Sequence, residues 1–275
     1  MGITYSQQDF ELVDYELYSL MGSRWKNSLF LRGPIPKTLA PKQYFVCLGA
    51  AQTFGRFCPK PYGTLLSENL SFSSLNFGFG GAGAEFFLER SQILDYVNNA
   101  KFVIVQVMSG RSQSNSWIHK KGKNNISEYV DLLKQNSNDL DFVNRVISET
   151  RTNWVNSYIQ LFDRIQVPII LFWFSIRKPD YIQRYDNVYQ LLGKYPQLIN
   201  LETLENIKNY SDEYVECVSN RGMPQKLIGR FTGMPVIAPY AQRKDSYNQY
   251  YPSPEMHIDA ANMLEPICQK YIESS

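Results

Sequence analysis

The sequence predicts a single three-layer α/β domain, in which a parallel sheet has helices on both faces. The chain has 275 residues, 44% hydrophobic and 20% charged, which is enough for one domain with a sizeable core. Short apolar runs alternate along it with segments of helical period. The first three apolar runs are each followed by small, polar or glycine-rich residues, as a ligand cleft at the strand ends of a parallel sheet requires.

Five apolar runs are interpreted as strands of this sheet. Their hydrophobic character is nearly continuous, which is typical of parallel strands covered on both faces. In the flavodoxin-like order expected for such a pattern, the first strand lies centrally, with the second and third on either side. The predicted strands are residues 43–49, 72–78, 102–108, 167–175 and 197–202.

Six segments between and after these runs are interpreted as helices. Residues 1–40 are polar and aromatic and end in a Pro- and Gly-rich stretch, which favours an N-terminal extension packed on a domain of residues 41–275. Gly222 is expected to end the fifth helix as a C-cap. The predicted helices are residues 61–70, 85–100, 141–165, 179–195, 203–222 and 257–272.

Composition and charge exclude several classes of function. The formal net charge of +2 gives no general reason to bind nucleic acid or an acidic membrane. The one basic cluster, residues 119–123, lies among Ser, Asn and Gly and is interpreted as a solvated loop. Aromatic residues are abundant at 14%, which fits either a Tyr-rich core and surface or a sugar-binding cleft.

The cysteines indicate neither a metal site nor a disulfide framework. Cys47, Cys58, Cys217 and Cys268 have no metal-ligand spacing, and Cys47 lies in an apolar run as a small core residue would. Without a signal peptide or an apolar run of membrane-spanning length, a cytoplasmic protein with reduced thiols and no membrane insertion is expected.

Four short blocks resemble the SGNH (GDSL-like) hydrolase superfamily. The superfamily's first block, G-D-S-x-T-x-G, aligns with residues 49–55, where Ala51 takes the place of the serine. Its last block, D-x-x-H, aligns with residues 254–257 and ends at His257. The second block matches Asn76, Gly78 and Gly81, and the third falls in residues 108–115.

Two narrower resemblances concern carbohydrates. The phrases "GAAQTFGRF", "QVMSGRS" and "YYPSPEMH" resemble an uncharacterised bacterial family of SGNH-like domains, which implies polysaccharide modification. Residues 49–52 also resemble the G-x-C-Q pattern of capsule-biosynthesis acetyltransferases, although Ala51 stands where that pattern has cysteine. The second resemblance implies coenzyme A, or another activated donor, as a possible cofactor.

The departures from the SGNH pattern matter for the chemistry. Ala51 has no hydroxyl with which to attack an acyl carbon, and Pro254 replaces the aspartate that orients the histidine. A standard triad therefore cannot be written. His257 can still take a proton from a substrate hydroxyl, because an unperturbed histidine has a pKa near 6.5. Glu255 is the carboxylate left to orient it.

The expected function is an enzyme that acts on a carbohydrate hydroxyl or its ester, by group transfer or de-esterification, with His257 as general base. The alternatives are a non-catalytic glycan-binding module and an esterase whose nucleophile is Ser109. The candidate catalytic residues are His257, Glu255 and Ser109. The candidate oxyanion and substrate-binding residues are Gln52, Thr53, Gly81, Arg111 and Asn115, and all these residues are expected to line one pocket.

Overall fold

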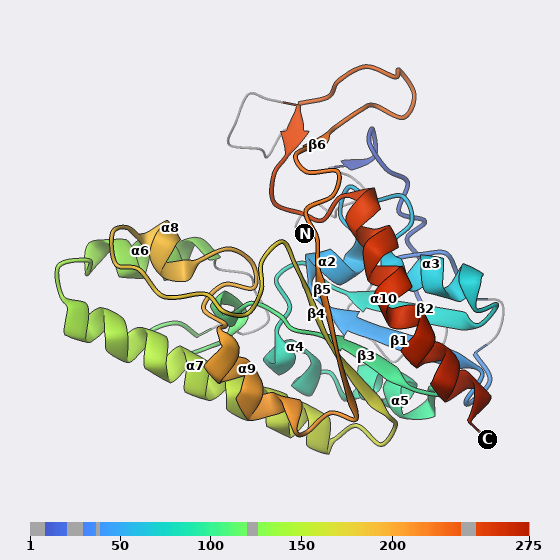
Figure 1. Ribbon diagram of the computed structural model, residues 1–275, viewed down its shortest axis with the longest axis horizontal. Coiled ribbons are helices and arrows are strands. Elements are labelled where there is room, and N and C mark those ends of the chain that lie inside the picture. The colour runs from blue at the N-terminus through green and yellow to red at the C-terminus, as the bar shows by residue number, and fades with distance from the viewer. Residues whose placement is uncertain (1–8, 21–29, 37–38, 120–125, 238–245, 275) are drawn as a thin grey trace.

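A computed structural model describes residues 9–20, 30–36, 39–119, 126–237 and 246–274 of the chain (Figure 1). Its centre is a five-stranded parallel sheet in the order β2-β1-β3-β4-β5. This is the flavodoxin-like order, with β1 between β2 and β3 as the sequence predicts. The strands are β1 Tyr44–Gly49, β2 Ser73–Gly78, β3 Val103–Gln106, β4 Ile169–Ser175 and β5 Glu213–Val218.

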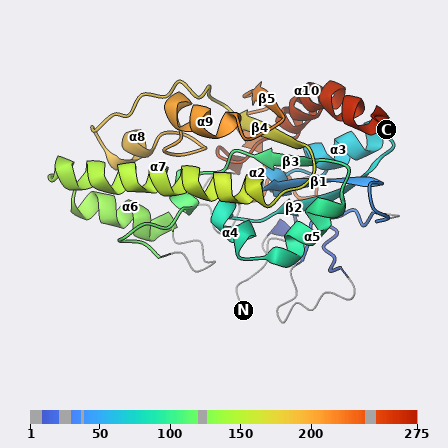
Figure 2. The same cartoon turned by 90° about the horizontal axis from the view of Figure 1, so that it is seen from below.

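Helices cover both faces of the sheet, so the predicted three-layer α/β architecture is confirmed (Figure 2). On one face lie α3 (Tyr62–Asn69) and α10 (Pro254–Glu273). On the other lie α4 (Ala84–Leu88), α5 (Ser91–Asn99) and α7 (Leu140–Asp163).

Alternation along the strands explains the two layers of core. In β1, Val46 and Leu48 face the α5 and α7 side, while Phe45 and Cys47 face α3 and α10. Successive side chains of a strand point to opposite faces, so a run that is apolar at every position fills both layers. Cys47 is fully buried, as predicted for a core residue.

In the first half of the chain, one predicted element needs revision and two observed elements were not predicted. The single helix over residues 85–100 is two helices, α4 and α5, which are separated at residues 89–90. Helix α6 (Ile126–Gln135) lies in a part of the chain that the sequence analysis left without an element. A short 3-10 helix, η1 (Gly110–Ser112), follows β3.

The region from residue 179 to residue 222 differs most from the sequence prediction. Only α8 (Val188–Leu192) forms within the predicted helix 179–195. Residues 197–202 are not a strand, because α9 (Leu201–Lys208) begins there. The fifth strand is instead β5, within the segment predicted as the fifth helix. Gly222, with a φ of 74°, lies in the turn after β5 and is not a helix cap.

The described part of the N-terminal segment is bonded to the domain by a buried ion pair. The Arg56 Nε atom lies 3.1 Å from the Asp9 Oδ2 atom, and Asp9 is fully buried. Tyr15 donates a hydrogen bond to the same carboxylate, at 3.0 Å. Burial raises the pKa of Asp9, while the Arg56 guanidinium opposes that shift.

A short helix and a short antiparallel strand pair complete the described fold. Helix α2 (Ala51–Phe54) follows β1 directly, and β6 (Gln225–Lys226) pairs antiparallel with β7 (Tyr247–Asn248). No helix among the described residues is long and apolar enough to cross a membrane. Apart from the exposed His119, the basic cluster 119–123 lies outside the described residues.

Candidate functional site

A cavity of about 790 Å³ opens beyond the carboxyl ends of β1, β3 and β4. This is where open parallel sheets hold their ligands, and the volume is in the usual range for small-molecule sites. The loop between β4 and α9 and the segment before α10 close its sides. The residues that line it are Gln52, Arg111, Phe174, Ser175, Ile176, Tyr189, Gln190, Leu192, Gly193, Lys194, Tyr195, Gln197, Gln249, Tyr250, Pro252 and Met256.

Glycines let the turn after β1 pack tightly against the sheet. A Cβ atom on Gly49 would lie 2.0 Å from the Thr53 Oγ1 atom, and one on Gly78 would lie 2.1 Å from the backbone nitrogen of Phe54. Both distances are far below van der Waals contact, so only glycine fits at either position. Helix α2 can therefore lie directly on the ends of β1 and β2, which places Gln52 at the cavity.

Gln106, at the end of β3, fixes this turn from behind. Its Oε1 atom accepts hydrogen bonds from the Ala50 backbone N–H at 3.0 Å and from the Thr53 hydroxyl at 2.7 Å. Its Nε2 atom donates to the Tyr195 hydroxyl at 2.9 Å. Thr53 is fully buried and also pairs with the Tyr62 hydroxyl at 2.9 Å. Thr53 therefore holds the turn and is not among the residues that line the cavity.

Gln52 lines the cavity with an unsatisfied polar atom. The side chain is only 2% exposed, and its Oε1 atom has no hydrogen-bond partner within the described parts of the chain. A buried acceptor without a donor is unfavourable by roughly 1–3 kcal/mol. A ligand hydroxyl or N–H group at this place would remove that penalty.

Arg111 lines one wall of the cavity, and Ser109 lies behind it in the turn after β3. The Ser109 hydroxyl accepts from the Arg111 backbone N–H at 3.2 Å and donates to Gln197 Oε1 at 2.9 Å. The Arg111 Nη2 atom donates to the Tyr250 hydroxyl at 3.1 Å. The Arg111 Nε atom is buried and has no partner among the described residues. Ser109 is thus a cap behind the wall, while Arg111 faces the cavity.

His257 differs from the sequence expectation, because it is fully buried in the core and does not line the cavity. Its ring lies between Tyr62, stacked at 6.0 Å, and the edge of Phe174 at 5.2 Å. Burial, with a smaller contribution from the Arg32 charge, lowers the pKa of His257 to about 3. The expectation of an ordinary pKa is therefore wrong, since this apolar environment disfavours the imidazolium.

The hydrogen bond to the His257 ring assigns its neutral tautomer. The Tyr62 backbone N–H donates to Nδ1 at 3.2 Å, so the proton of the neutral ring is on Nε2. That Nε2 atom has no partner among the described residues. In this state the free nitrogen is a hydrogen-bond donor and not a proton acceptor.

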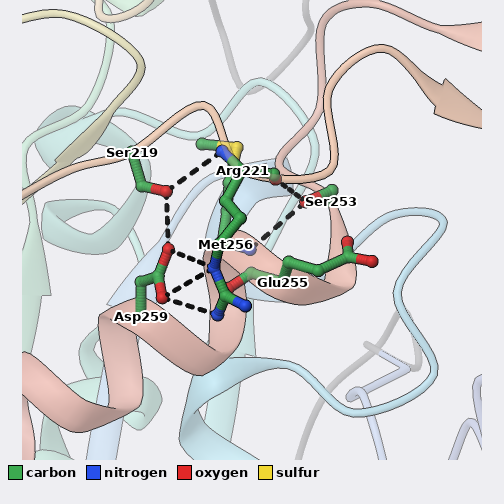
Figure 3. A network of polar contacts seen from close by, with 6 residues as sticks. All are labelled: Ser219, Arg221, Ser253, Glu255, Met256 and Asp259. Atoms are coloured by element: carbon green, nitrogen blue, oxygen red, sulfur yellow. Dashed lines mark hydrogen bonds and ion pairs between the residues drawn. The ribbon is translucent and has the colours of Figure 1, made fainter.

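Glu255 does not orient His257, contrary to the sequence expectation. Figure 3 shows its carboxylate directed away from the polar network at the start of α10. A Cβ atom on Gly222 would lie 2.1 Å from Glu255 Oε2, which places this carboxylate over the turn after β5. The Nδ1 atom of His257 is already bonded to Tyr62. The one-residue shift relative to the D-x-x-H pattern explains this, because adjacent helical residues face different directions.

Two further candidates lie away from the cavity. Asn115 lines a separate hollow of about 580 Å³, together with Gln113 and His119. Its Oδ1 atom accepts from the Trp117 N–H, and its Nδ2 atom donates to Thr150 Oγ1, both at 2.9 Å. Gly81 lies in the turn after β2, with a φ of 75°, and is not a lining residue. The expected convergence of all the candidates in one pocket therefore holds only for Gln52 and Arg111.

Several residues of the site were not identified from the sequence. Gln106 had a usable signal, because a buried amide inside the apolar run "FVIVQVM" requires bonded partners. Tyr195, Gln197 and Tyr250 had none, since they reach the cavity from loops far apart in the chain. No group of three or more His, Cys, Asp or Glu residues in the described ranges is arranged to hold a metal ion.

Three solved structures illustrate the comparison with known proteins. An α/β hydrolase from the metagenome of Lake Arreo is 12% identical, with 86% of this chain and 98% of that chain covered and a TM-score of 0.46. An acetylxylan esterase from Geobacillus stearothermophilus is 12% identical, with 86% of this chain and 97% of that chain covered and a TM-score of 0.40. A gut microbial diltiazem-metabolizing enzyme is 16% identical, with 66% of this chain covered and a TM-score of 0.35. The match covers 37% of that enzyme, so this chain spans little over a third of it.

These likenesses are too distant to assign an activity. All three TM-scores are below 0.5, so the fold assignment rests on the strand order and the layers described above. A search of curated proteins found no match. A family model described as "Domain of unknown function (DUF6473)" matches residues 3–144 and 128–272, which together span nearly the whole chain. The chain therefore belongs to this DUF6473 family.

Proposed function

We propose that the protein binds a hydroxyl-rich ligand of the carbohydrate class in the strand-end cavity, without hydrolysing an ester through a serine nucleophile. The observation that supports this most directly is the buried, unpartnered Oε1 atom of Gln52 among the lining residues. An acceptor in that position selects a ligand that brings a hydroxyl or N–H donor.

The remaining lining residues fit the same chemistry. Glutamine amides both donate and accept hydrogen bonds, as sugar hydroxyls require, and tyrosines add apolar ring faces with a polar tip. Tyr250 is 44% exposed and Tyr189 is 67% exposed, so both rings are accessible to a ligand. The amides and tyrosines of the lining are Gln52, Gln190, Gln197, Gln249, Tyr189, Tyr195 and Tyr250.

The surroundings of the possible nucleophiles support binding without ester hydrolysis. Ala51 stands at the position of the SGNH serine and has no nucleophilic atom. The Ser109 hydroxyl donates a hydrogen bond to the Gln197 Oε1 atom, and an amide oxygen is not a base that could activate it. A serine needs an adjacent general base to become a nucleophile, and the hydrogen-bond partners of the Ser109 hydroxyl are instead the Gln197 amide and the Arg111 backbone N–H.

The test compares two glutamines at opposite ends of β1. Gln52→Ala removes the amide in the cavity, whereas Gln43→Ala removes an exposed amide next to the amino end of the strand. Calorimetric titration with a panel of neutral and acidic oligosaccharides is expected to find a binder whose affinity drops about fivefold or more in Gln52→Ala. Gln43→Ala should bind as the unaltered protein does. A panel that contains no binder, or one that binds both variants equally, would overturn the proposal.

A second candidate function is group transfer or de-esterification on a carbohydrate hydroxyl or its ester, with His257 as general base and an activated donor such as an acyl-coenzyme A. The unpartnered Nε2 atom of His257 favours it, because its neighbour Met256 lines the cavity. To act as a base on Nε2, the ring would have to shift its proton to Nδ1 and release Tyr62.

An ester assay separates the two candidates. We expect no hydrolysis of a chromogenic acetate ester by the unaltered protein, and no gain in Ala51→Ser. The reason is that burial makes His257 a weak base, with a pKa of about 3, and that its Nε2 carries the proton because Nδ1 accepts the Tyr62 backbone N–H. Gln43→Ala serves as the background control. A robust gain of esterase activity in Ala51→Ser, or saturable binding of acetyl-coenzyme A, would favour the catalytic function instead.

A further inference from the structure

Among the described residues, the lining of the strand-end cavity contains cations but no anions. Arg111 and Lys194 are the charged residues among those that line it, and neither Asp nor Glu is among the described lining residues. Salt bridges in the described ranges involve other cations, such as Arg56 with Asp9 and Arg221 with Asp259. The cavity therefore combines positive charge with ligand-sized space.

Arg111 is held in place by neutral groups. Its guanidinium donates to the Tyr250 hydroxyl, and Gln197 Nε2 donates to the same hydroxyl at 3.3 Å. Tyr250 in turn packs edge-on against Tyr251, with ring centroids 4.9 Å apart. These contacts orient the guanidinium without neutralising its charge. The Arg111 Nε–H group remains buried without an acceptor.

Two lining groups without a partner in the described parts of the chain require opposite partners. Gln52 Oε1 needs a donor, which a sugar hydroxyl supplies, whereas Arg111 Nε needs an acceptor. Oxyanions are the strongest acceptors for a guanidinium, because the bond is charge-assisted and often bidentate. A neutral sugar would satisfy Gln52 but leave the Arg111 charge without a counter-ion.

We propose that the ligand of this cavity is an acidic sugar, a carbohydrate whose carboxylate or phosphate group binds Arg111 while its hydroxyls bind Gln52. Lys194 adds a second positive charge on the side formed by the loop before α9. This inference rests on the proposed carbohydrate-binding function and narrows its substrate class. The shared chemistry is an oxyanion on a hydroxyl-rich ring, as in a uronic acid or a sugar phosphate.

The test uses matched probes and matched variants. The probes are a glucuronic-acid disaccharide, glucose 6-phosphate, maltose as the neutral sugar, and inorganic phosphate as the anion alone. The variants are Arg111→Gln, Arg111→Lys and, as control, Arg184→Gln, which removes an exposed arginine outside this cavity. Calorimetric titration at low and at high salt measures each affinity, and thermal unfolding confirms that the variants fold.

We expect at least one acidic sugar to bind more tightly than maltose and to lose about tenfold or more in affinity in Arg111→Gln. Arg111→Lys should keep part of the affinity, and Arg184→Gln should keep all of it. The probe that binds distinguishes a carboxylate from a phosphate ligand.

The outcomes separate this inference from the proposed function. Equal binding of maltose and the acidic sugars, unaffected by Arg111→Gln, would overturn the acidic-sugar inference and leave carbohydrate binding intact. Binding of inorganic phosphate that depends on Arg111, with no binding of any sugar, would overturn carbohydrate binding and with it the acidic-sugar ligand. If none of the probes binds, both proposals are wrong.

Discussion

The first turn of α10 and the strand-end cavity adjoin each other, since Met256 belongs to both. They differ in whether their polar groups have hydrogen-bond partners. At the start of α10, the Arg221 guanidinium bonds both Asp259 oxygens and the Glu255 backbone oxygen (Figure 3). Ser219 donates to Asp259 at 2.6 Å. In the cavity, Arg111 Nε and Gln52 Oε1 have no partners among the described residues.

This difference separates a structural network from a binding site. Ser219, Arg221 and Asp259 connect the end of β5 to the amino end of α10, and the two charges in this network pair with each other. The cavity leaves a donor and an acceptor unsatisfied, which is unfavourable for the empty protein and favourable once a ligand arrives. Polar residues of similar type thus have different roles, and only the partners that surround them reveal which.

The largest expected effect tests whether His257 stabilises the fold, as the Arg221 network does, or takes part in a reaction at the cavity. His257→Ala removes a fully buried ring and leaves the Tyr62 N–H without an acceptor. We expect the free energy of unfolding to fall by about 2–4 kcal/mol. Urea unfolding measures it, with the exposed neighbour variant Ile258→Ala as control. If His257→Ala kept its stability but lost a measurable activity, His257 would have a catalytic role instead.

A smaller effect is expected in the pH dependence of stability. The pKa of His257 is about 3 in the folded protein, against about 6.5 when unfolded, so the unfolded chain binds the proton first as the pH falls. His257 therefore contributes stability above pH 6.5 that is lost between pH 6.5 and 3. Between pH 7 and 5, we expect the loss to be about 2 kcal/mol larger for the unaltered protein than for His257→Gln. His119→Gln, which alters an exposed histidine, should behave like the unaltered protein, and equal slopes for all three would contradict this prediction.

The smallest effect is expected at the Arg221 network itself. Arg221 is 53% exposed and Asp259 is 28% exposed in their side chains, so water screens this ion pair. Asp259→Asn should lower the melting temperature by about 3 °C or less, and less still at high salt. Thermal unfolding at two salt concentrations tests this, with Asp163→Asn, at the far end of α7, as control. A decrease as large as that of His257→Ala would mean that the network is essential for docking α10.

The fold could be predicted in large part from the sequence because it rests on apolar runs. Strands β1, β3 and β4 are buried along their whole length and stand out as hydrophobic segments whose positions need no partner to be recognised. β5 was missed because its sequence "EYVECV" contains two glutamates and is only partly buried, so no apolar run marks it. Glu213 and Glu216 favoured the helix interpretation, and pairing with β4 decided the strand.

The sequence by itself determined the alternation of strands and helices, the glycines after β1 and β2, and the absence of a serine at position 51. Each is a local property of residue type or spacing. Only the tertiary structure decided which polar groups meet. Arg111 and Tyr250 are 139 residues apart in the chain, and His257 lies in the first turns of a helix that the sequence also predicted. The ring is neutral because it is buried between Tyr62 and Phe174, and its proton is on Nε2 because the Tyr62 backbone N–H donates to Nδ1. Both depend on contacts that the order of the residues does not display.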